Sequence, residues 1–387
     1  SITNRSLRQS LIVSSGLKVT NINVELIERK VKPIPVQDKR GALGGKITQG
    51  ILRVQTDGDL EGNAFIGNLG ESSPQRINTI IEVLRPIIVG MNINEREWLW
   101  NQITNMPKNF QEPIEAAWAP LDVALWDLQG QITGQPIHEL LGTARSVVPA
   151  YATYPPRHSE PEGYVNEALE IQSQGFKAYK IHPGNLSPVT TCEMVEKVRA
   201  AVGDDMALMF DPNNGYELKD ALYIGNALDA NGFFWYEDPV PSQDLDAVIK
   251  LSQSLKTPIN MSDSLEFLLH EATHLLGLET IQFVRGTARK LGITGLKKQM
   301  SIAEGFRKHV EIGLGGNTPM NLANLHVMMS SQNCNYYEHW LPQELHTWGA
   351  KNQILVDENG NINAPELPGL GLELDEEWVK FHKITTL

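Results

Sequence analysis

Three acidic residues recur at equal intervals in the middle of the chain, each close behind a short apolar run. They are Asp211, Glu237 and Asp263, and each lies 26 residues from the next (211 to 237, and 237 to 263). This interval suits one strand and one helix, so each acid occupies the same point of three successive units. In a parallel barrel, such points meet at the C-terminal rim, where active sites gather.

Three carboxylates that converge on one point predict a bound cation. Without a cation they would repel one another, and their pKa values would rise. Ligation by oxygen atoms alone suits Mg²⁺, so we predict that Asp211, Glu237 and Asp263 hold one Mg²⁺ ion. The alternative is that the three are unrelated acids that cap the helices after their strands. The regular spacing favours the metal site, because capping does not require it.

A lysine and a histidine two residues apart precede the first of these acids. Lys180 and His182 fall at a predicted strand, where alternate residues point to the same side, here toward the metal site. An ammonium group close to an imidazole disfavours the imidazolium, which leaves His182 neutral and able to accept a proton near pH 7. We therefore predict that His182 is a general base beside Lys180. The alternative, a surface lysine and a histidine in a turn, is disfavoured by the neighbouring carboxylates.

Other polar residues are candidates for binding a substrate. Glu338 follows the last predicted strand and could hydrogen-bond to a substrate carboxylate if it is protonated. Four cations and one amide could meet a polar, anionic substrate. These predicted substrate-binding residues are Lys39, Arg40, Arg157, Asn213 and Arg285. For each cation alone, the alternative is a solvated surface charge.

The pattern after residue 147 predicts the elements that position these residues. Short apolar strands alternate with amphipathic helices about every 25 to 30 residues, the spacing of βα units. Eight such strands predict a barrel. They are Val148–Tyr154, Ala178–Ile181, Ala207–Phe210, Phe234–Tyr236, Ile259–Met261, Ile281–Val284, Val310–Ile312 and Tyr336–Tyr337.

The N-terminal third has a different pattern. Strand-like runs at Val19–Ile27 and Ile47–Thr56 flank a Gly-rich and charged stretch, Gln37–Lys46, which predicts a hairpin with a long, mobile loop. Apolar residues then recur at helical spacing from 74 to about 142. We predict an α+β domain at residues 1–145, a barrel at 146–347 and a segment at 348–387 that returns to the first domain.

Composition and charge exclude several classes of function. The 387 residues include 33 lysines and arginines against 46 acidic residues, a formal charge of -13, with no basic patch to attract nucleic acid or anionic lipid. No apolar run approaches the roughly 18 residues that cross a bilayer, and no secretory signal is evident. Cys192 and Cys334 lack metal-ligand spacing and are predicted to be buried, reduced thiols. We expect a cytoplasmic protein that binds neither nucleic acid nor membranes.

With these residues in place, the chain resembles the mandelate racemase subgroup of the enolase superfamily over nearly its full length. The matching pieces are Lys180-Ile181-His182 where the family has Lys-x-Lys, Asp211-Pro212-Asn213, Glu237-Asp238-Pro239, Asp263 where Glu is usual, Glu338, and the closing stretch from Pro368 to Asp375. The resemblance implies a modified TIM barrel, (β/α)7β, with Mg²⁺, and an α+β capping domain built from both chain ends. The N-terminal loop, with Lys39 and Arg40, would close over the barrel and contact the distal part of a small-molecule carboxylate. We also expect a homo-oligomer.

Two departures from the family bear on the reaction. Many members carry an Asp–His dyad on the sixth and seventh strands as a second base on the opposite face of the substrate, but here Thr287 and Gly313 stand at these positions. A racemase needs a base on each face, so this loss argues against 1,1-proton transfer. Dehydration does not require the second base. In a syn elimination His182 takes the α-proton and then protonates the departing β-hydroxyl, while Mg²⁺ and Lys180 stabilise the enediolate.

The leading hypothesis is therefore an acid-sugar dehydratase, a hydro-lyase of carbohydrate catabolism that converts an aldonate or aldarate to a 2-keto-3-deoxy acid. Two alternatives stay open. One is a racemase or epimerase of a carboxylic acid, with an opposite-face base that the sequence does not reveal. The other is a protein that keeps the fold and the metal, has lost turnover, and serves in binding.

Overall fold

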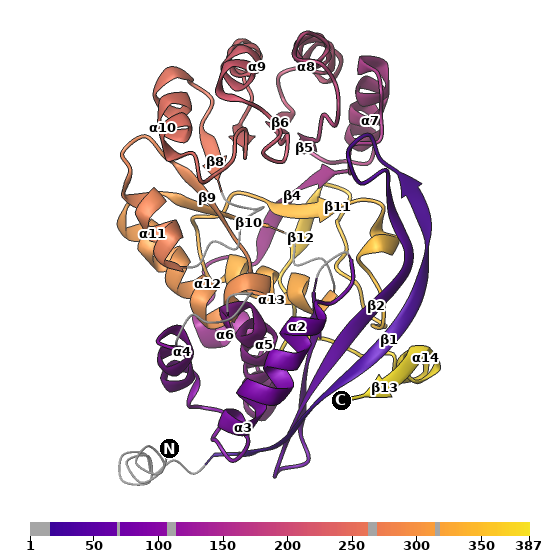
Figure 1. The fold of residues 1–387 in the computed structure, drawn as a ribbon, viewed down its shortest axis with the longest axis vertical. Helices are drawn as coiled ribbons and strands as arrows, with labels where there is room; N and C mark the ends of the chain where they lie inside the picture. Colours follow the sequence, from indigo (N-terminus) through magenta and orange to yellow (C-terminus); the bar gives the residue numbers. More distant parts are fainter. Residues whose placement is uncertain (1–15, 68–69, 107–113, 262–268, 314–317) are drawn as a thin grey trace.

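The computed structural model describes residues 16–67, 70–106, 114–261, 269–313 and 318–387. Within these ranges the chain forms a curled, mainly parallel sheet with helices on its outside, and a four-stranded antiparallel sheet with helices of its own (Figure 1). This is the predicted α/β architecture, in which a barrel-like sheet carries an α+β capping domain.

Both ends of the chain build the capping sheet. Its strands are β1 (Val19–Pro35), β2 (Ala42–Thr56), β3 (Glu61–Ile66) and β13 (Lys383–Thr386), in the order β13-β1-β2-β3. The C-terminal strand β13 follows α14 (Glu376–His382) and pairs antiparallel with β1. The C-terminal segment therefore returns to the N-terminal domain, as the sequence predicts (Figure 1).

The hairpin of β1 and β2 differs from the prediction. The second half of the stretch expected to be a long, mobile loop, Gln37–Lys46, belongs to β2, and the connection is limited to residues 36–41. Val36 N closes it by donating to Gly41 O over 3.0 Å. The strand was predicted as a loop because this stretch is rich in glycine. Gly44 and Gly45 have positive φ values where the register of β1 shifts, so they accommodate an irregularity instead of ending the ladder.

The helices of the capping domain follow β3. They are α2 (Pro74–Asn78), a π-helical turn (Thr79–Leu84), α3 (Arg85–Ile88), α4 (Arg96–Thr104), α5 (Ile114–Thr133) and α6 (Ile137–Leu141). Helix α5 is rich in small apolar residues and buries most of its length between β3 and α12 (Ala288–Gly305). Its close approach to β3 requires Gly62, because a Cβ there would lie 2.2 Å from Ala124 O.

Eight parallel strands form the curled sheet, in the order β10-β9-β8-β7-β6-β5-β4-β11, and β12 (Asn361–Asn363) pairs antiparallel with β4. The parallel strands are β4 (Val147–Thr153), β5 (Ala178–Ile181), β6 (Ala207–Phe210), β7 (Trp235–Glu237), β8 (Ile259–Met261), β9 (Phe283–Gly286), β10 (His309–Ile312) and β11 (Tyr337–Trp340). The outer helices are α7 (Pro161–Ser173), α8 (Pro188–Val202), α9 (Leu218–Ala230), α10 (Leu245–Ser254), α11 (Leu269–Gly277), α12 and α13 (Thr318–Met329).

The observed bounds of β5, β6 and β8 equal the predicted ones, whereas those of β9 and β11 are displaced along the chain. β9 continues through Arg285, and β11 continues through Glu338 to Trp340. Both charged residues therefore lie within strands. The sequence pattern instead predicts each of them after the end of its strand. The apolar-run rule failed because the two side chains point into the barrel and neutralise each other there.

The inside of the barrel has its own apolar core beneath these charges. It consists of Tyr151, Ala178, Met209, Trp235 and Phe283. Within the described residues, the strands β10 and β11 are the two ends of the sheet order and do not pair with each other, and the side chain of Glu311 in β10 connects them. The buried carboxylate of Glu311 accepts hydrogen bonds from the backbone N–H of Asn335 at 3.1 and 3.2 Å.

The predictions on the cysteines and on membrane-spanning segments can be compared with the structure. Cys334 is buried as predicted, but Cys192 is only half-buried, and both are free thiols. Among the described helices, none is both long enough and apolar enough to span a bilayer.

Candidate active site

Lys180 is the centre of a cluster of buried charges inside the barrel. Its ammonium group lies 2.8 Å from Glu338 Oε2, 3.1 and 3.2 Å from the two carboxylate oxygens of Glu237, and 3.4 Å from Asp211 Oδ2. Burial opposes the charged form of Lys180, but Glu237 and Glu338 outweigh it and hold the pKa of Lys180 well above its usual value. Lys180 is therefore a fixed positive charge.

Glu338 receives donors from several strands. Arg285 Nη2 lies 2.6 Å from Glu338 Oε2, the Tyr151 hydroxyl donates to the same oxygen, and Trp340 Nε1 donates to Oε1 over 2.7 Å. Burial would raise the pKa of Glu338, but Lys180 and Arg285 hold it well below its usual value. The carboxylate is therefore ionised and accepts hydrogen bonds. Its expected hydrogen bond to a substrate carboxylate, which requires a protonated Glu338, stays a prediction.

Arg285 also lies deeper than the sequence predicts. Its side chain is buried, and Nε lies 3.2 Å from Glu237 Oε1 while Nη2 contacts Glu338. Arg285 thus links the carboxylates of β7 and β11 from below the rim. These contacts place Arg285 in the charge cluster, and its contact with a substrate stays a prediction.

His182 points inward from the end of β5, on the same side as Lys180. Its Nδ1 lies 2.8 Å from Tyr154 O and 3.1 Å from the hydroxyl of Thr153. A carbonyl oxygen can only accept, so Nδ1 carries a proton and Nε2 is the nitrogen that remains to exchange one. Nε2 lies 3.1 Å from Asp211 Oδ2, and the indole of Trp340 packs 5.2 Å from the imidazole.

Asp211 and Glu237 are the two predicted metal ligands within the described residues; Asp263 lies outside them. Both carboxylates are buried on neighbouring strands, and Asn213 N fixes Asp211 by donating to Oδ1 over 2.8 Å. Burial would raise the pKa of Asp211, but Lys180 and His182 lower it to about 2. Two ionised carboxylates that already share a cation, the ammonium of Lys180, have the donor chemistry that Mg²⁺ requires. Among the described residues, no three acidic, histidine or cysteine side chains stand together as a complete metal site.

The tip of the capping hairpin reaches the barrel beside α7 (Figure 1). Gln37 N donates to Pro156 O over 2.6 Å, and the approach requires Gly184, because a Cβ there would lie 2.5 Å from Gln37 O. Burial would raise the pKa of Asp38, but hydrogen bonds from the side chain and the backbone N–H of Arg40 lower it.

The remaining predicted substrate contacts lie at the periphery. Lys39 is exposed at the tip, and Arg40 is paired with Asp38. Arg157 is engaged away from the cluster, with its Nε 2.5 Å from Glu167 Oε2 and its guanidinium 3.6 Å from the ring of Tyr154. Asn213 contributes its backbone N–H, while its side chain is exposed.

The positions of the missing dyad are tied together by Asn324 of α13. Its Oδ1 accepts from Ala288 N over 2.7 Å, and its Nδ2 donates to Gly313 O over 2.8 Å and to the Thr287 hydroxyl over 3.4 Å. Thr287 caps the start of α12 by accepting from Arg289 N. These positions thus carry structural hydrogen bonds in place of an Asp–His pair.

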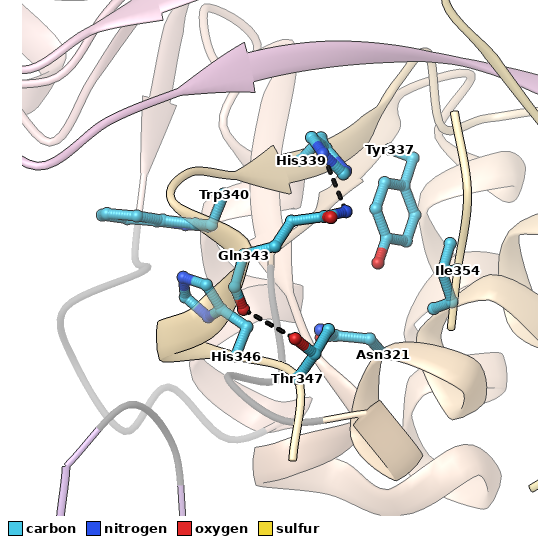
Figure 2. Close-up of a pocket in the computed structure, with 8 residues that line it drawn as sticks. All are labelled: Asn321, Tyr337, His339, Trp340, Gln343, His346, Thr347 and Ile354. Atoms are coloured by element: carbon cyan, nitrogen blue, oxygen red, sulfur yellow. Dashed lines mark hydrogen bonds between the residues drawn. The ribbon is translucent and has the colours of Figure 1, made fainter. Parts of the chain in front are cut away.

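A small pocket lies beside β11, on the side to which Tyr337 and His339 point (Figure 2). It has room for about 30 Å³, enough for a water molecule or a hydroxyl group. Its described lining residues are Asn321, Tyr337, His339, Trp340, Gln343, His346, Thr347 and Ile354. Neither ring nitrogen of the buried His346 has a hydrogen-bond partner among the described residues, and burial lowers the pKa of His346 to about 3. The pocket therefore presents neutral polar groups.

Several residues of the site escaped sequence reasoning. Tyr151, Thr153 and Trp340 contact the predicted residues, yet aromatic and threonine side chains on strands usually indicate packing. The alternation of side chains could have found two of them. Tyr151 and Thr153 lie on the same face of β4, and Trp340 shares the inward face of β11 with Glu338.

Two known families match the chain. Residues 21–142 match the mandelate racemase / muconate lactonizing enzyme N-terminal domain, and residues 163–378 match the enolase C-terminal domain-like family. Together the two matches cover most of the chain. The first includes the helices and the β1–β3 strands of the capping domain, and the second includes the strands that carry the charge cluster.

The more similar proteins include enzymes of two reaction classes. Arabinonate dehydratase of Saccharolobus solfataricus is 26% identical over 302 residues, which cover 76% of this chain and 79% of that protein. L-Ala-D/L-Glu epimerase of Bacillus subtilis is 26% identical over 307 residues, which cover 78% of this chain and 82% of that protein.

A solved structure of D-glucarate dehydratase from Agrobacterium tumefaciens, complexed with magnesium, is 26% identical. It superposes with a TM-score of 0.86 over 96% of this chain and 100% of that chain. Because both dehydratases and an epimerase are similar, the likeness does not decide the reaction. The chain belongs to the enolase superfamily, in the group of mandelate racemase and muconate lactonizing enzymes.

Proposed function

We propose that the protein is a Mg²⁺-dependent acid-sugar dehydratase, which converts an aldonate or aldarate to a 2-keto-3-deoxy acid. The observation that carries the proposal is the one-sided base. His182 faces the carboxylate cluster, whereas the positions of a second base, Thr287 and Gly313, are bonded to Asn324. A base on one face suffices for syn elimination but not for racemisation. The similarity to arabinonate dehydratase supports this choice.

Asp211 and Glu237 would hold the Mg²⁺ ion together with Asp263. The bound ion would supply positive charge to oppose the negative charge that develops on the substrate carboxylate. The buried, ionised state of Asp211 favours this assignment, because a cation needs deprotonated ligands. The similar D-glucarate dehydratase was solved with magnesium, which supports the choice of metal.

His182 would carry both proton transfers. Its Nε2 takes the proton from C2, because Nδ1 already donates to Tyr154 O. The electron pair of the broken C–H bond enters the carboxylate group and then forms the C2–C3 double bond as the C3–oxygen bond breaks. His182 returns the proton to the departing hydroxyl, so that water leaves. The resulting enol tautomerises to the 2-keto acid.

Lys180 would stabilise the negative charge that develops on the substrate carboxylate. Its ammonium group is held by Glu237 and Glu338, and its raised pKa keeps it charged at neutral pH. Glu338 would act through Lys180, because an ionised carboxylate cannot donate a hydrogen bond to the substrate. Arg285 and Tyr151 would hold Glu338 in place.

The rest of the substrate would contact the rim. Lys39 at the hairpin tip is the exposed cation nearest in sequence to the contact between Gln37 and Pro156, so we retain it as a contact for the distal end.

An epimerase is the second candidate, because L-Ala-D/L-Glu epimerase is as similar as arabinonate dehydratase. The deciding experiment incubates the purified protein with Mg²⁺ and a library of acid sugars, and follows the formation of 2-keto acids. We expect one or a few stereochemically related sugars to react. Epimerised sugars without any 2-keto acid would replace the dehydratase with the epimerase.

A further inference from the structure

A buried amide lies in the barrel without a hydrogen bond. Asn260 of β8 is fully buried, and neither its Oδ1 nor its Nδ2 has a partner in the part of the chain that the structure describes. Buried polar side-chain atoms are bonded in the large majority of cases, so an amide with both ends unused calls for an explanation. A ligand that comes to the site would provide one.

The register of the strands gives the direction of Asn260. It pairs with Glu237 of β7 on one side and with Phe283 of β9 on the other. Paired residues of parallel strands point to the same face of the sheet. Glu237 contacts Lys180 inside the barrel, and Phe283 belongs to the core inside the barrel. Asn260 therefore points inward, beside the carboxylate of Glu237.

The same register places Asn260 in a row with both described metal-ligand candidates. Phe210 pairs with Tyr236, so the next residues, Asp211 and Glu237, are neighbours, and Glu237 in turn pairs with Asn260. Adjacent strands lie about 4.8 Å apart, so the three side chains can reach a shared point. Two carboxylates and an amide oxygen on consecutive strands form a row of oxygen donors.

We propose that Asn260 belongs to the divalent-cation site, where its amide would serve the bound ion or a water of its shell. The inference rests on the proposed metal site and goes beyond it, because it adds an uncharged residue to the expected carboxylates. An amide oxygen serves either the ion itself or a water that Mg²⁺ retains.

The test replaces Asn260 with leucine, which has a similar volume and no polar atoms. Mg²⁺ binding to the metal-free protein is measured by isothermal titration calorimetry, and thermal unfolding is measured in EDTA. We expect the Kd for Mg²⁺ to rise by about 10- to 100-fold, the usual effect of losing a residue that supports a metal site. The unfolding temperature without metal should stay the same or rise, because no hydrogen bond is lost.

Two further variants keep the test decisive. Met261→Leu changes the next residue of the strand, which is buried on the other side of the sheet, and should leave the Kd for Mg²⁺ within twofold of the wild type. Asn260→Ala takes the place of Asn260→Leu if leucine prevents folding. Wild-type binding together with unchanged binding by the Asn260 variant overturns this inference alone. Absence of Mg²⁺ binding by the wild type overturns the proposed metal site and this inference with it.

Discussion

His182 Nε2 lies 3.1 Å from Asp211 Oδ2, so the proposed base and a proposed metal ligand are in direct contact. Because Nδ1 faces the carbonyl oxygen of Tyr154, the contact with Asp211 occupies the nitrogen that would receive a substrate proton. The base and the cation site are therefore adjacent parts of one cluster. The effect of a substitution at His182 on turnover can nevertheless be measured separately from its effect on Mg²⁺ binding.

The first prediction concerns this separation. His182→Asn should fold and bind Mg²⁺ like the wild type, because asparagine keeps a polar side chain at the strand end. Turnover should fall by roughly 10²- to 10⁴-fold, the usual contribution of a positioned acid–base group. Steady-state kinetics and Mg²⁺ titration test both parts. A variant with wild-type turnover would place the base elsewhere.

The second prediction concerns Lys180, whose buried ammonium group contacts Glu237 and Glu338. Lys180→Met should weaken substrate binding as well as turnover, because the ammonium group meets the substrate carboxylate before and during the reaction. It should also destabilise the fold, since two buried carboxylates lose their partner. A loss of turnover with unchanged KM and stability would contradict this account.

The third prediction concerns Asn324, which joins the loops after β9 and β10. Asn324→Leu should lower the free energy of unfolding by about 3 kcal/mol, because buried backbone groups of Ala288 and Gly313 lose their partner. Asn226→Leu on the exposed face of α9 is the matched control and should change it by less than about 0.5 kcal/mol. If urea unfolding showed the same loss of stability for Asn324→Leu and Asn226→Leu, the structural role of Asn324 would be contradicted.

The fourth prediction concerns pH. The buried His326 accepts from His138 N at Nδ1 and faces Leu370 O at Nε2, and burial lowers its pKa to about 3. The unfolded state, with a pKa near 6.5, binds a proton more readily, so this stability is present above pH 6.5 and is lost as pH falls toward 3. The slope from His326 is about 1.4 kcal/mol per pH unit. In urea unfolding, His326→Gln should flatten the pH dependence below 6.5; an unchanged slope would contradict the prediction.

Spacing and alternation predicted the middle of the site better than its edges. Asp211, Glu237, Lys180 and His182 lie close together in the structure, because one repeated βα interval and a period of two determine which side chains converge, and their roles stay predictions. Asp263 stays a prediction, since it lies outside the described residues.

Other features depend on contacts between distant segments. An apolar-run rule ends a strand at its first charge, so it missed the mutual neutralisation of Arg285 and Glu338 inside β9 and β11. Periodicity likewise contains no signal for Asn324, which reaches Thr287 from a helix 37 residues further along the chain.

The most direct test of the central claim is a proton NMR measurement in D2O with Mg²⁺ and the acid sugar found by the library screen. Elimination by His182 predicts a 2-keto-3-deoxy acid that carries one solvent deuteron at C3, because the enol takes its new proton from water. His182→Asn should abolish both the product and the deuteron. A recovered sugar that carries deuterium at C2 with inverted configuration, and no 2-keto acid, would contradict the account and identify an epimerase.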